Sequence, residues 1–282
     1  MAESKVFLNG RIIDAASACI SISDAGFLHG ASTFTTMLAH NGKVFRLDRH
    51  LERLGETVRL LGLNTNATVE TLRQAVRDVL TANDLQSARV RIMLTPGPVN
   101  DERPTTLVTA QAIGQTPAHW YEKGIDVVVT SFKAHKGDIT CGYKTGCYLP
   151  RMLARQEAAV KGAQDALWFT SDNYLAEGCT SNVFLVLDGK VLTPPRDTPV
   201  LPGIVREAVL ELCRDLSIPA DDQTPLTVRE MLAAQEVFLT SSVAGIRPVV
   251  RIERHPVGDE KPGEITRRII AAYHQLLDRE SQ

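Results

Sequence analysis

Short runs of apolar residues, separated by turn residues, mark the first part of the chain. Asn9-Gly10 and Asn41-Gly42 are dipeptides that favour tight two-residue turns, and each lies between two such runs. The first pair of runs covers residues 6–8 and 11–13, and the second covers 33–39 and 43–45. The pattern therefore predicts two β-hairpins. Residues 23–30, which carry two glycines, are predicted to form a loop.

Helical periodicity begins after the second hairpin. Leucines and a valine recur every three or four residues from 47 to 61, which predicts an amphipathic helix with Asp48 as its N-cap and Gly62 just beyond its end. A second amphipathic helix is predicted over 68–82, and strands are predicted over 90–94 and 105–112. The proline-rich, charged loop at 95–104 either borders a site or is an ordinary surface connection.

The second half of the chain again mixes strand and helix patterns. Apolar runs predict strands over 125–130, 166–170 and 237–239, and Asp188-Gly189 predicts a hairpin between 183–187 and 190–192. Helices are predicted over 204–216 and 264–277, and another begins at Pro150, which suits a first helical turn because it has no N–H group. The apolar face expected for this helix consists of Leu149, Met152, Leu153 and Ala159. The segment 114–119 looks like a join between two domains.

Length and composition narrow the classes of protein. A chain of 282 residues is long enough for two domains with a substantial core. A net charge of −2 without basic runs argues against nucleic acid as a partner, and the apolar runs are far shorter than a membrane span. The first residues lack an apolar segment of signal-peptide length, and five scattered cysteines fit a reducing cytoplasm better than a disulfide framework. The cysteine and histidine spacings do not favour a metal site.

One lysine stands in an unusual local environment. Lys144 lies among small and aromatic residues in Gly142-Tyr143-Lys144-Thr145-Gly146-Cys147-Tyr148, with no carboxylate within five residues on either side. An amine held in a small, partly dry space loses its proton more readily and can attack a carbonyl carbon. Lys144 is therefore a candidate Schiff-base lysine. On this stretch alone, a solvated lysine in a turn is the commoner situation.

Candidate partners for such a lysine lie elsewhere in the chain. Glu177 is an isolated carboxylate followed by a glycine, and Leu201-Pro202-Gly203 leads into a helix whose first N–H groups could bind phosphate. Three hydroxyl groups follow the strand at 237–239, in Thr240-Ser241-Ser242. Three arginines share one face of the first long helix: Arg46, Arg49 and Arg53. Each feature alone has an ordinary alternative, which is a plain turn for the glycine segment and a solvated face for the arginines.

Together these groups meet the needs of one cofactor. Pyridoxal 5′-phosphate has an aldehyde that bonds to a lysine, a phosphate that binds helix N-termini, hydroxyls and arginine, and a ring nitrogen that a carboxylate keeps protonated. Each unit by which a carboxylate raises the pKa of that nitrogen needs about 1.4 kcal/mol of interaction, and a partly buried Glu177 could supply several units. The combination predicts a pyridoxal-phosphate enzyme.

On these residues the sequence resembles the class IV (fold-type IV) pyridoxal-phosphate enzymes. This family includes branched-chain and D-amino-acid aminotransferases, R-selective amine transaminases and aminodeoxychorismate lyase. The resemblance runs from about Val6 to Val249, and its phosphate cup is most similar to that of the branched-chain enzymes. It rests on segments in family order: Phe45–Leu54, Lys144, Glu177–Phe184, Thr193-Pro194-Pro195, Leu201–Arg206 and Thr240–Val243.

The resemblance implies a two-domain α/β (α+β) fold. A smaller N-terminal α/β domain is expected over 1–114, a linker over 115–123 and a larger C-terminal pseudo-barrel domain over 124–282. It implies that Lys144 is the catalytic Schiff-base residue, that Glu177 pairs with the ring nitrogen and that Tyr148 binds the phenolic oxygen. The other cofactor-binding residues that it implies are Arg53, Ile204, Val205, Ser241 and Ser242.

Departures from the family pattern bear on the substrate. Branched-chain enzymes usually carry Phe-Glu-Gly-Ile-Arg where this chain has Phe34-Thr35-Thr36-Met37-Leu38, so the pocket arginine is missing and the sequence is closer to the lyase pattern. Cys147 replaces a common asparagine, Tyr148 lies one residue closer to the lysine than in the branched-chain motif, and Val205 replaces a threonine. The substrate-binding candidates are Phe34, Thr36, Arg91 and Val243, and the candidates to bind the substrate carboxylate are Arg91, Arg103 and Arg247.

The resemblance implies a transaminase that moves an amino group between an amino acid or amine and a 2-oxo acid. The alternative is an aminodeoxychorismate lyase that releases pyruvate and 4-aminobenzoate, and the third choice is a non-catalytic carrier of the cofactor. Thr35-Thr36 favours the lyase, whereas the Leu-Pro-Gly-Ile cup favours the transaminase. The expected partners are a small-molecule amino donor, a 2-oxo acid and a second copy of the chain in a cytoplasmic homodimer, with loop 95–104 long enough to reach across its interface. The sequence does not determine the donor or its stereochemistry.

Overall fold

The computed structural model describes residues 4–99, 101, 103–114 and 117–281. The chain divides into two compact units. The first unit comprises Met1–Gly114, Lys144–Cys147 and Leu277–Gln282, and the second comprises Gln115–Tyr143 and Tyr148–Leu276. The predicted loop at 95–104 and join at 114–119 are covered only in part, since residues 100, 102, 115 and 116 lie outside the described residues. The predicted domain limits stay a prediction.

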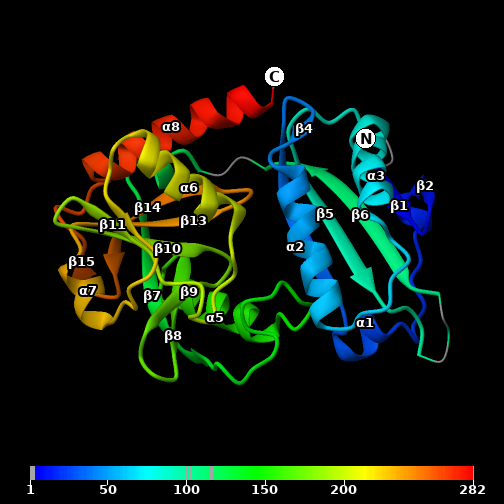
Figure 1. The fold of residues 1–282 in the computed structure, drawn as a ribbon, viewed down its shortest axis with the longest axis horizontal. Coiled ribbons are helices and arrows are strands. Elements are labelled where there is room, and N and C mark those ends of the chain that lie inside the picture. The colour runs from blue at the N-terminus through cyan, green and yellow to red at the C-terminus, as the bar shows by residue number, and fades with distance from the viewer. Residues whose placement is uncertain (1–3, 100, 102, 115–116, 282) are drawn as a thin grey trace. The chain divides into compact units, whose positions relative to one another are not determined.

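The first unit contains a six-stranded antiparallel sheet in the order β2-β1-β6-β5-β3-β4 (Figure 1). Both predicted hairpins are confirmed. Asn9 and Gly10 have positive φ angles of 48° and 91°, and Asn41 and Gly42 have 51° and 75°, as a two-residue type I′ turn requires. The strands are β1 (Lys5–Leu8), β2 (Arg11–Asp14), β3 (Thr33–His40), β4 (Lys43–Val44), β5 (Ala88–Thr95) and β6 (Thr105–Ala112).

Two long helices, α2 (Leu47–Leu60) and α3 (Val69–Ala82), pack against this sheet and against each other. Alternate residues of β3 and β5 lie in the shared core, so one face of the sheet is buried under the helices. The prediction of Asp48 as N-cap was wrong. Arg46 occupies that position with φ 51°, and Asp48 lies in the first turn, where its carboxylate accepts hydrogen bonds from Arg73.

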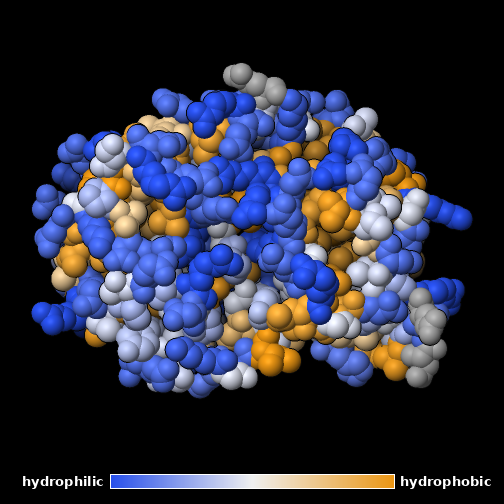
Figure 2. All heavy atoms as spheres, viewed as in Figure 1, coloured by the Kyte–Doolittle hydropathy of each residue, from blue (hydrophilic) through white to orange (hydrophobic). Residues whose placement is uncertain are grey.

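Residues 23–30 are not wholly a loop, because they contain the short helix α1 (Ala25–His29). The buried Asp24 caps it by accepting a hydrogen bond from the N–H of Gly26. Asp24 is itself held by the hydroxyls of Thr95 and Thr105, so contacts distant in sequence stabilise a helix that local pattern does not favour. Near this helix, Ile22 and Phe27 are 83% and 73% exposed. Figure 2 shows hydrophobic side chains reaching an otherwise mostly hydrophilic surface.

The second unit is built on a sheet that closes on itself. Its strands pair in the order β10-β13-β14-β7-β8-β9, and β9 then pairs with β10 through Glu177 and Asn182. The ring confirms the predicted pseudo-barrel. Its strands are β7 (Ile125–Ala134), β8 (Asp165–Thr170), β9 (Leu175–Gly178), β10 (Asn182–Leu187), β13 (Glu236–Ser241) and β14 (Gly245–Ile252). Three short strands extend the sheet: β11 (Lys190–Leu192), β12 (Ala220–Asp221) and β15 (His255–Pro256).

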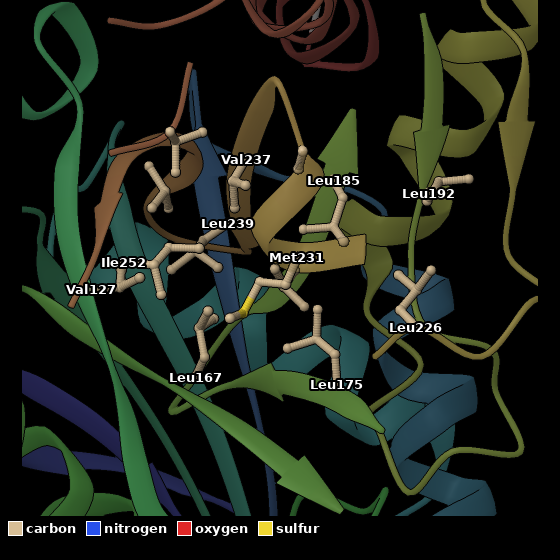
Figure 3. Close-up of a cluster of buried hydrophobic side chains, with 14 of the residues drawn as sticks. Val127, Leu167, Leu175, Leu185, Leu192, Leu226, Met231, Val237, Leu239 and Ile252 are labelled. Carbon is tan, nitrogen blue, oxygen red and sulfur yellow. The ribbon is translucent and has the colours of Figure 1, made fainter. Parts of the chain in front are cut away.

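Apolar side chains from all six ring strands form one buried cluster. Figure 3 shows leucines, valines and isoleucines of these strands pointing toward one another, with Met231 of α7 (Val228–Ala233) among them. The cluster explains why the strands read as nearly continuous apolar runs, since the opposite sides of several strands are covered by helices. It gives the strands that carry the candidate site a rigid base.

Helices α5 (Leu149–Val160), α6 (Ile204–Asp215) and α8 (Glu264–Glu280) also belong to this part of the fold, with the end of α8 in the first unit. The start of α5 with Pro150 in its first turn is confirmed. Its predicted apolar face is wrong, because Leu149 and Met152 are 65% and 62% exposed and α5 instead packs through Ala154 and Ala158. The other helices are α4 (His119–Glu122) and the 3-10 helix η1 (Ala15–Ser17). Within the described ranges, no helix has both the length and the apolar character of a membrane-spanning segment.

Candidate active site

The predicted site residues fall into two groups, one in each unit. We call Phe34, Thr35, His50, Arg53, Arg91 and Lys144 the lysine set, and all six belong to the first unit. We call Arg151, Glu177, Asn182, Leu201, Gly203 and Thr240 the glutamate set, and all six belong to the second unit. Each set is described on its own.

The lysine segment is bound to β3 by backbone contacts. The carbonyl oxygen of Lys144 accepts hydrogen bonds from the N–H of Phe34 (2.9 Å) and from the hydroxyl of Thr33 (3.0 Å). Two residues later, the N–H of Gly146 donates to the carbonyl of Ser32 (2.8 Å), and a Cβ at Gly146 would lie 2.1 Å from the Ser32 hydroxyl oxygen. Only glycine permits this close approach. The segment therefore has a fixed path, and Lys144 lies in a loop just before α5, as predicted.

The side chain of Lys144 lies against an aromatic ring. Its Nζ is 4.9 Å from the ring centre of Phe34, which is buried. The guanidinium carbon of Arg91 lies 3.7 Å from the same ring centre. Because Arg91 is paired with Thr36 across β3 and β5, the sheet register places it next to Phe34. Three predicted residues, Lys144, Phe34 and Arg91, are thus brought together.

Arg53 reaches the lysine set through a hydroxyl group. Its Nη2 donates to the hydroxyl oxygen of Thr35 (3.3 Å), and this hydroxyl also contacts Nδ1 of His50 (2.9 Å). His50 is one helical turn before Arg53 on α2, so both side chains can meet the same group on β3. The other two arginines of the predicted trio are elsewhere, since Arg46 pairs with Glu280 and Arg49 with Glu52. The contacts of Arg46 and Arg49 thus differ from that of Arg53, and an anion site at the three arginines stays a prediction.

His50 is a buried histidine that the sequence interpretation missed. Burial lowers its pKa well below the usual value, and the positive charges of Arg53 and Lys144 lower it further. His50 is therefore neutral near pH 7. Its place one turn before Arg53 was the signal that could have identified it.

In the glutamate set, three strands form a row of polar residues at the closure of the barrel. Asn182 of β10 is paired with Glu177 of β9 on one side and with Thr240 of β13 on the other. Ser241 ends β13 and is paired with Gly245 of β14. Ser242 and Val243 follow in the turn between these strands. The predicted carboxylate and the predicted hydroxyl segment therefore lie on the two strands that flank β10, as the sequence alone could not show.

Glu177 is buried, and both of its carboxylate oxygens have partners. Oε1 accepts a hydrogen bond from Nη2 of Arg151 (2.5 Å), and Oε2 accepts one from the N–H of Leu201 (3.0 Å). Arg151 also donates to the carbonyls of Gly178 and Cys179. Burial by itself lowers the pKa of Arg151, but the neighbouring Glu177 raises it by more, so that the net pKa is raised. Arg151 thus places a positive charge directly opposite this buried carboxylate.

The start of α6 is held next to the same row. The side-chain amide of Asn182 donates to the carbonyl of Leu201 (2.9 Å), and a Cβ at Gly203 would lie 2.0 Å from Oδ1 of Asn182. Gly203 is the N-cap and has no side chain to bond the first helical N–H groups. The N–H groups of Ile204 and Val205 belong to the first turn, which has no earlier carbonyls within the helix to bond, while both side chains are buried. Their placement suits the predicted binding of an anion.

The remaining predicted residues have mixed outcomes. Tyr148 is the N-cap residue of α5, and its ring centre lies 6.0 Å from the guanidinium carbon of Arg151. Arg247 is buried and paired with Asp165 (3.0 Å). Arg103 is an exposed residue paired with Asp101. Of the three arginines considered for a substrate carboxylate, only Arg91 lies in the lysine set.

Comparison with known proteins agrees with this geometry. The model of the family described as amino-transferase class IV matches residues 32–252. A putative branched-chain-amino-acid aminotransferase of Methanocaldococcus jannaschii is 30% identical over 273 residues, which cover 94% of this chain and 93% of the relative. A D-alanine aminotransferase of Staphylococcus haemolyticus is 30% identical over 284 residues, which cover 99% of each chain.

Solved structures show the same fold along nearly the whole chain. The crystal structure of the branched-chain amino acid aminotransferase of Escherichia coli matches with a TM-score of 0.93 at 28% identity. The match covers 99% of this chain and 96% of that one. The arrangement of strands and helices, including the curled sheet of the second unit, is therefore shared with that enzyme.

Proposed function

We propose that this chain, which belongs to the class IV aminotransferases, uses pyridoxal 5′-phosphate to move an amino group between an amino acid and a 2-oxo acid. Membership of the family and full-length relatives with aminotransferase names make the chain an enzyme. We further propose the cofactor, the residues that hold it, a dimer and a compartment.

The residues present fit this cofactor. In the glutamate set, a buried carboxylate paired with Arg151 lies on the strand next to Asn182, and Asn182 also orders the start of α6. A ring nitrogen needs such a carboxylate, and a phosphate needs the N–H groups of a helix start. In the lysine set, the amine of Lys144 and the guanidinium of Arg91 lie against the buried Phe34 ring, and Arg53 bonds the neighbouring Thr35 hydroxyl, which suits the anionic parts of a cofactor or substrate.

The proposal assigns members of both sets to one cofactor, as the family resemblance implies. Glu177 would hold a proton at the ring nitrogen. Arg53, the N–H groups of Ile204 and Val205, and the hydroxyls of Ser241 and Ser242 would bind the phosphate. Tyr148 would bind the phenolic oxygen. Phe34, Thr36, Arg91 and Val243 would contact the substrate, with Arg91 the preferred partner of its carboxylate because it lies beside Lys144 and Phe34.

When bound, the cofactor supplies an aldehyde that takes up amines and a protonated ring that accepts electron density. Lys144 has two tasks in this scheme. Its amine would hold the cofactor between turnovers, and it would take a proton from the substrate's alpha carbon and pass it to the cofactor's C4′ carbon. The backbone contacts of Lys144 and Gly146 fix the main chain, so that the flexible side chain alone has to move.

The observation that carries the proposal is the row Glu177–Asn182–Thr240 with the start of α6 held against it. It is tested by reducing the purified, cofactor-loaded protein with borohydride and mapping the labelled peptide. We expect the label on Lys144, and a label on Lys133 or Lys136 would refute the assignment. A panel of L-amino acids, D-amino acids and R-amines, with pyruvate and 2-oxoglutarate as acceptors, then identifies the donor. A pyruvate-release assay on aminodeoxychorismate, run beside it, tests the lyase alternative.

We also propose a homodimer in the cytoplasm. Large apolar residues are exposed in both units, among them Ile22, Phe27, Met152 and Val160, and a second copy of the chain would cover such residues. Sedimentation at the enzyme concentration used for assays tests the dimer, and an active monomer would refute it. If sites are shared, mixing a Lys144→Ala subunit with one deleted in the loop at 95–104 should restore one working site for each heterodimer.

A further inference from the structure

Arg151 is the one charged side chain that hydrogen-bonds Glu177 among the described residues of the second unit. The Glu177 side chain is 5% exposed and that of Arg151 is 23% exposed, so the pair is largely shielded from water. Arg151 lies in the first turn of α5, directly after Pro150. The helix that follows the lysine loop thus delivers the cation that neutralises the candidate ring partner.

The carboxylate of Glu177 can accept a further donor. An ionised carboxylate offers about four acceptor positions, and Glu177 uses one for Arg151 and one for the N–H of Leu201. A protonated ring nitrogen could therefore bind Glu177 without displacing Arg151. The carboxylate would then serve two cations at once.

We propose that Arg151 is a positioning residue that shares the carboxylate of Glu177 with the cofactor's ring nitrogen and thereby sets the pH at which the carboxylate–ring pair releases its proton. This inference rests on the proposed function, in which Glu177 binds that nitrogen. The proton held between an acid and a base belongs to the pair, and a fixed positive charge beside the pair favours its release. Arg151 would in this way limit how strongly the ring is kept protonated.

Other groups near Glu177 do not supply this charge. On β8, Asp165 is paired with Arg247, so its charge is balanced. Burial raises the pKa of the Cys179 thiol to about 12, and this group is therefore neutral. On β10 the neighbour is the neutral Asn182, and on α5 it is Tyr148, beside Arg151. A substitution of Arg151 should therefore change the positive charge next to the Glu177 carboxylate.

The test follows the ring nitrogen directly. Wild type and variants are loaded with pyridoxal 5′-phosphate labelled with ¹⁵N in the ring, and the ¹⁵N chemical shift is recorded against pH. Arg151→Gln and Arg151→Met remove the charge, and Arg151→Met keeps much of the aliphatic stem in case the amide disturbs the turn. Arg151→Lys keeps the charge. We expect the neutral variants to release the proton at a pH about one unit higher than wild type and Arg151→Lys to follow wild type.

Two results would overturn the inference. The first is a ring nitrogen that releases its proton at the same pH in wild type and in both neutral variants. A nitrogen that stays protonated in all three proteins over the pH range in which they remain folded counts as the same result. The other is an equal shift in Arg151→Lys and Arg151→Gln, because the hydrogen-bond geometry and not the charge would then matter. Glu177→Gln separates this inference from the proposed function. If Glu177→Gln leaves the nitrogen's titration unchanged, Glu177 is not the ring partner, whereas a changed titration leaves only the role of Arg151 to be decided by the Arg151 variants.

Discussion

The two sets differ in how they balance charge. The lysine set places Lys144 and Arg91 against the buried Phe34 ring and Arg53 on the Thr35 hydroxyl, and its histidine, His50, is kept neutral. The glutamate set contains a buried acid matched by one arginine. Cationic side chains suit a set that binds anionic groups, whereas an ion pair suits a set that must hold one carboxylate in a dry place. The difference assigns anion binding and amine chemistry to one set, and control of a proton to the other.

Removing the amine of the lysine set should have the largest effect. Lys144→Ala should lower turnover on the order of 10⁴-fold, because no other group in that set can bond covalently to an aldehyde. The fold should persist, since Lys144 contacts β3 through its backbone. The matched control is Lys133→Ala, a lysine of β7 that stacks over Phe169. The measurements are the transamination rate and the extent of borohydride labelling. If Lys144→Ala and Lys133→Ala lowered both by equal amounts, Lys144 would have no special role.

Neutralising the acid of the glutamate set should have the next largest effect. Glu177→Gln should retain the cofactor but lower turnover roughly 10²- to 10³-fold, because an amide cannot stabilise a positive charge on a ring nitrogen. Glu260→Gln, which changes an exposed carboxylate paired with Arg251, is the control. The measurement is single-turnover transamination at saturating cofactor. Turnover of Glu177→Gln at the wild-type rate would make Glu177 a structural residue of the barrel closure.

Local sequence predicted the elements best where a short stretch determines the structure. Asn9-Gly10 and Asn41-Gly42 form their hairpins because two residues with positive φ suffice. The buried face of α5 was mispredicted, since its leucines and methionine are exposed. Which face of this helix is buried depends on strands that are distant in sequence.

The site shows the same limit. Lys144, Glu177 and the start of α6 could be proposed as site candidates from sequence, but the contact between Arg151 and Glu177 joins residues 26 positions apart. The three arginines of α2 also have different partners. Arg49 pairs with Glu52 of the same helix, whereas Arg46 pairs with Glu280, near the end of the chain. Arg53 bonds Thr35 of strand β3. Helical spacing gives the direction of a side chain, and only the packed fold supplies its partner.

A sharper comparison sets Arg53 of the lysine set against Arg49, another arginine of the same helix. Arg53→Ala should weaken cofactor affinity roughly ten- to a hundredfold, since a charged hydrogen bond to phosphate contributes about 1.5–3 kcal/mol. Arg49→Ala removes an exposed arginine paired with Glu52 on α2 and should leave the affinity unchanged. The dissociation constant can be followed by the quenching of protein fluorescence as the apoenzyme binds cofactor. Equal affinities in the two variants would return Arg53 to the solvated face of α2.

The smallest expected effect is on stability and comes from His50. Its pKa is lowered in the fold, whereas in the unfolded chain a histidine has a pKa near 6.5, so the unfolded state binds the extra proton first as pH falls. The stability that His50 contributes is therefore fully present above about pH 6.5 and is lost progressively below it, at up to about 1.4 kcal/mol for each pH unit.

His50→Gln cannot take up that proton, and its amide can still meet the Thr35 hydroxyl. Urea unfolding at pH 7.5 and 5.5 should thus show a smaller loss of unfolding free energy in His50→Gln than in wild type, while His274→Gln, an exposed histidine of α8, should behave as wild type. An undiminished loss in His50→Gln would mean that neither burial nor the nearby charges of Arg53 and Lys144 lower the pKa of His50 in the folded protein.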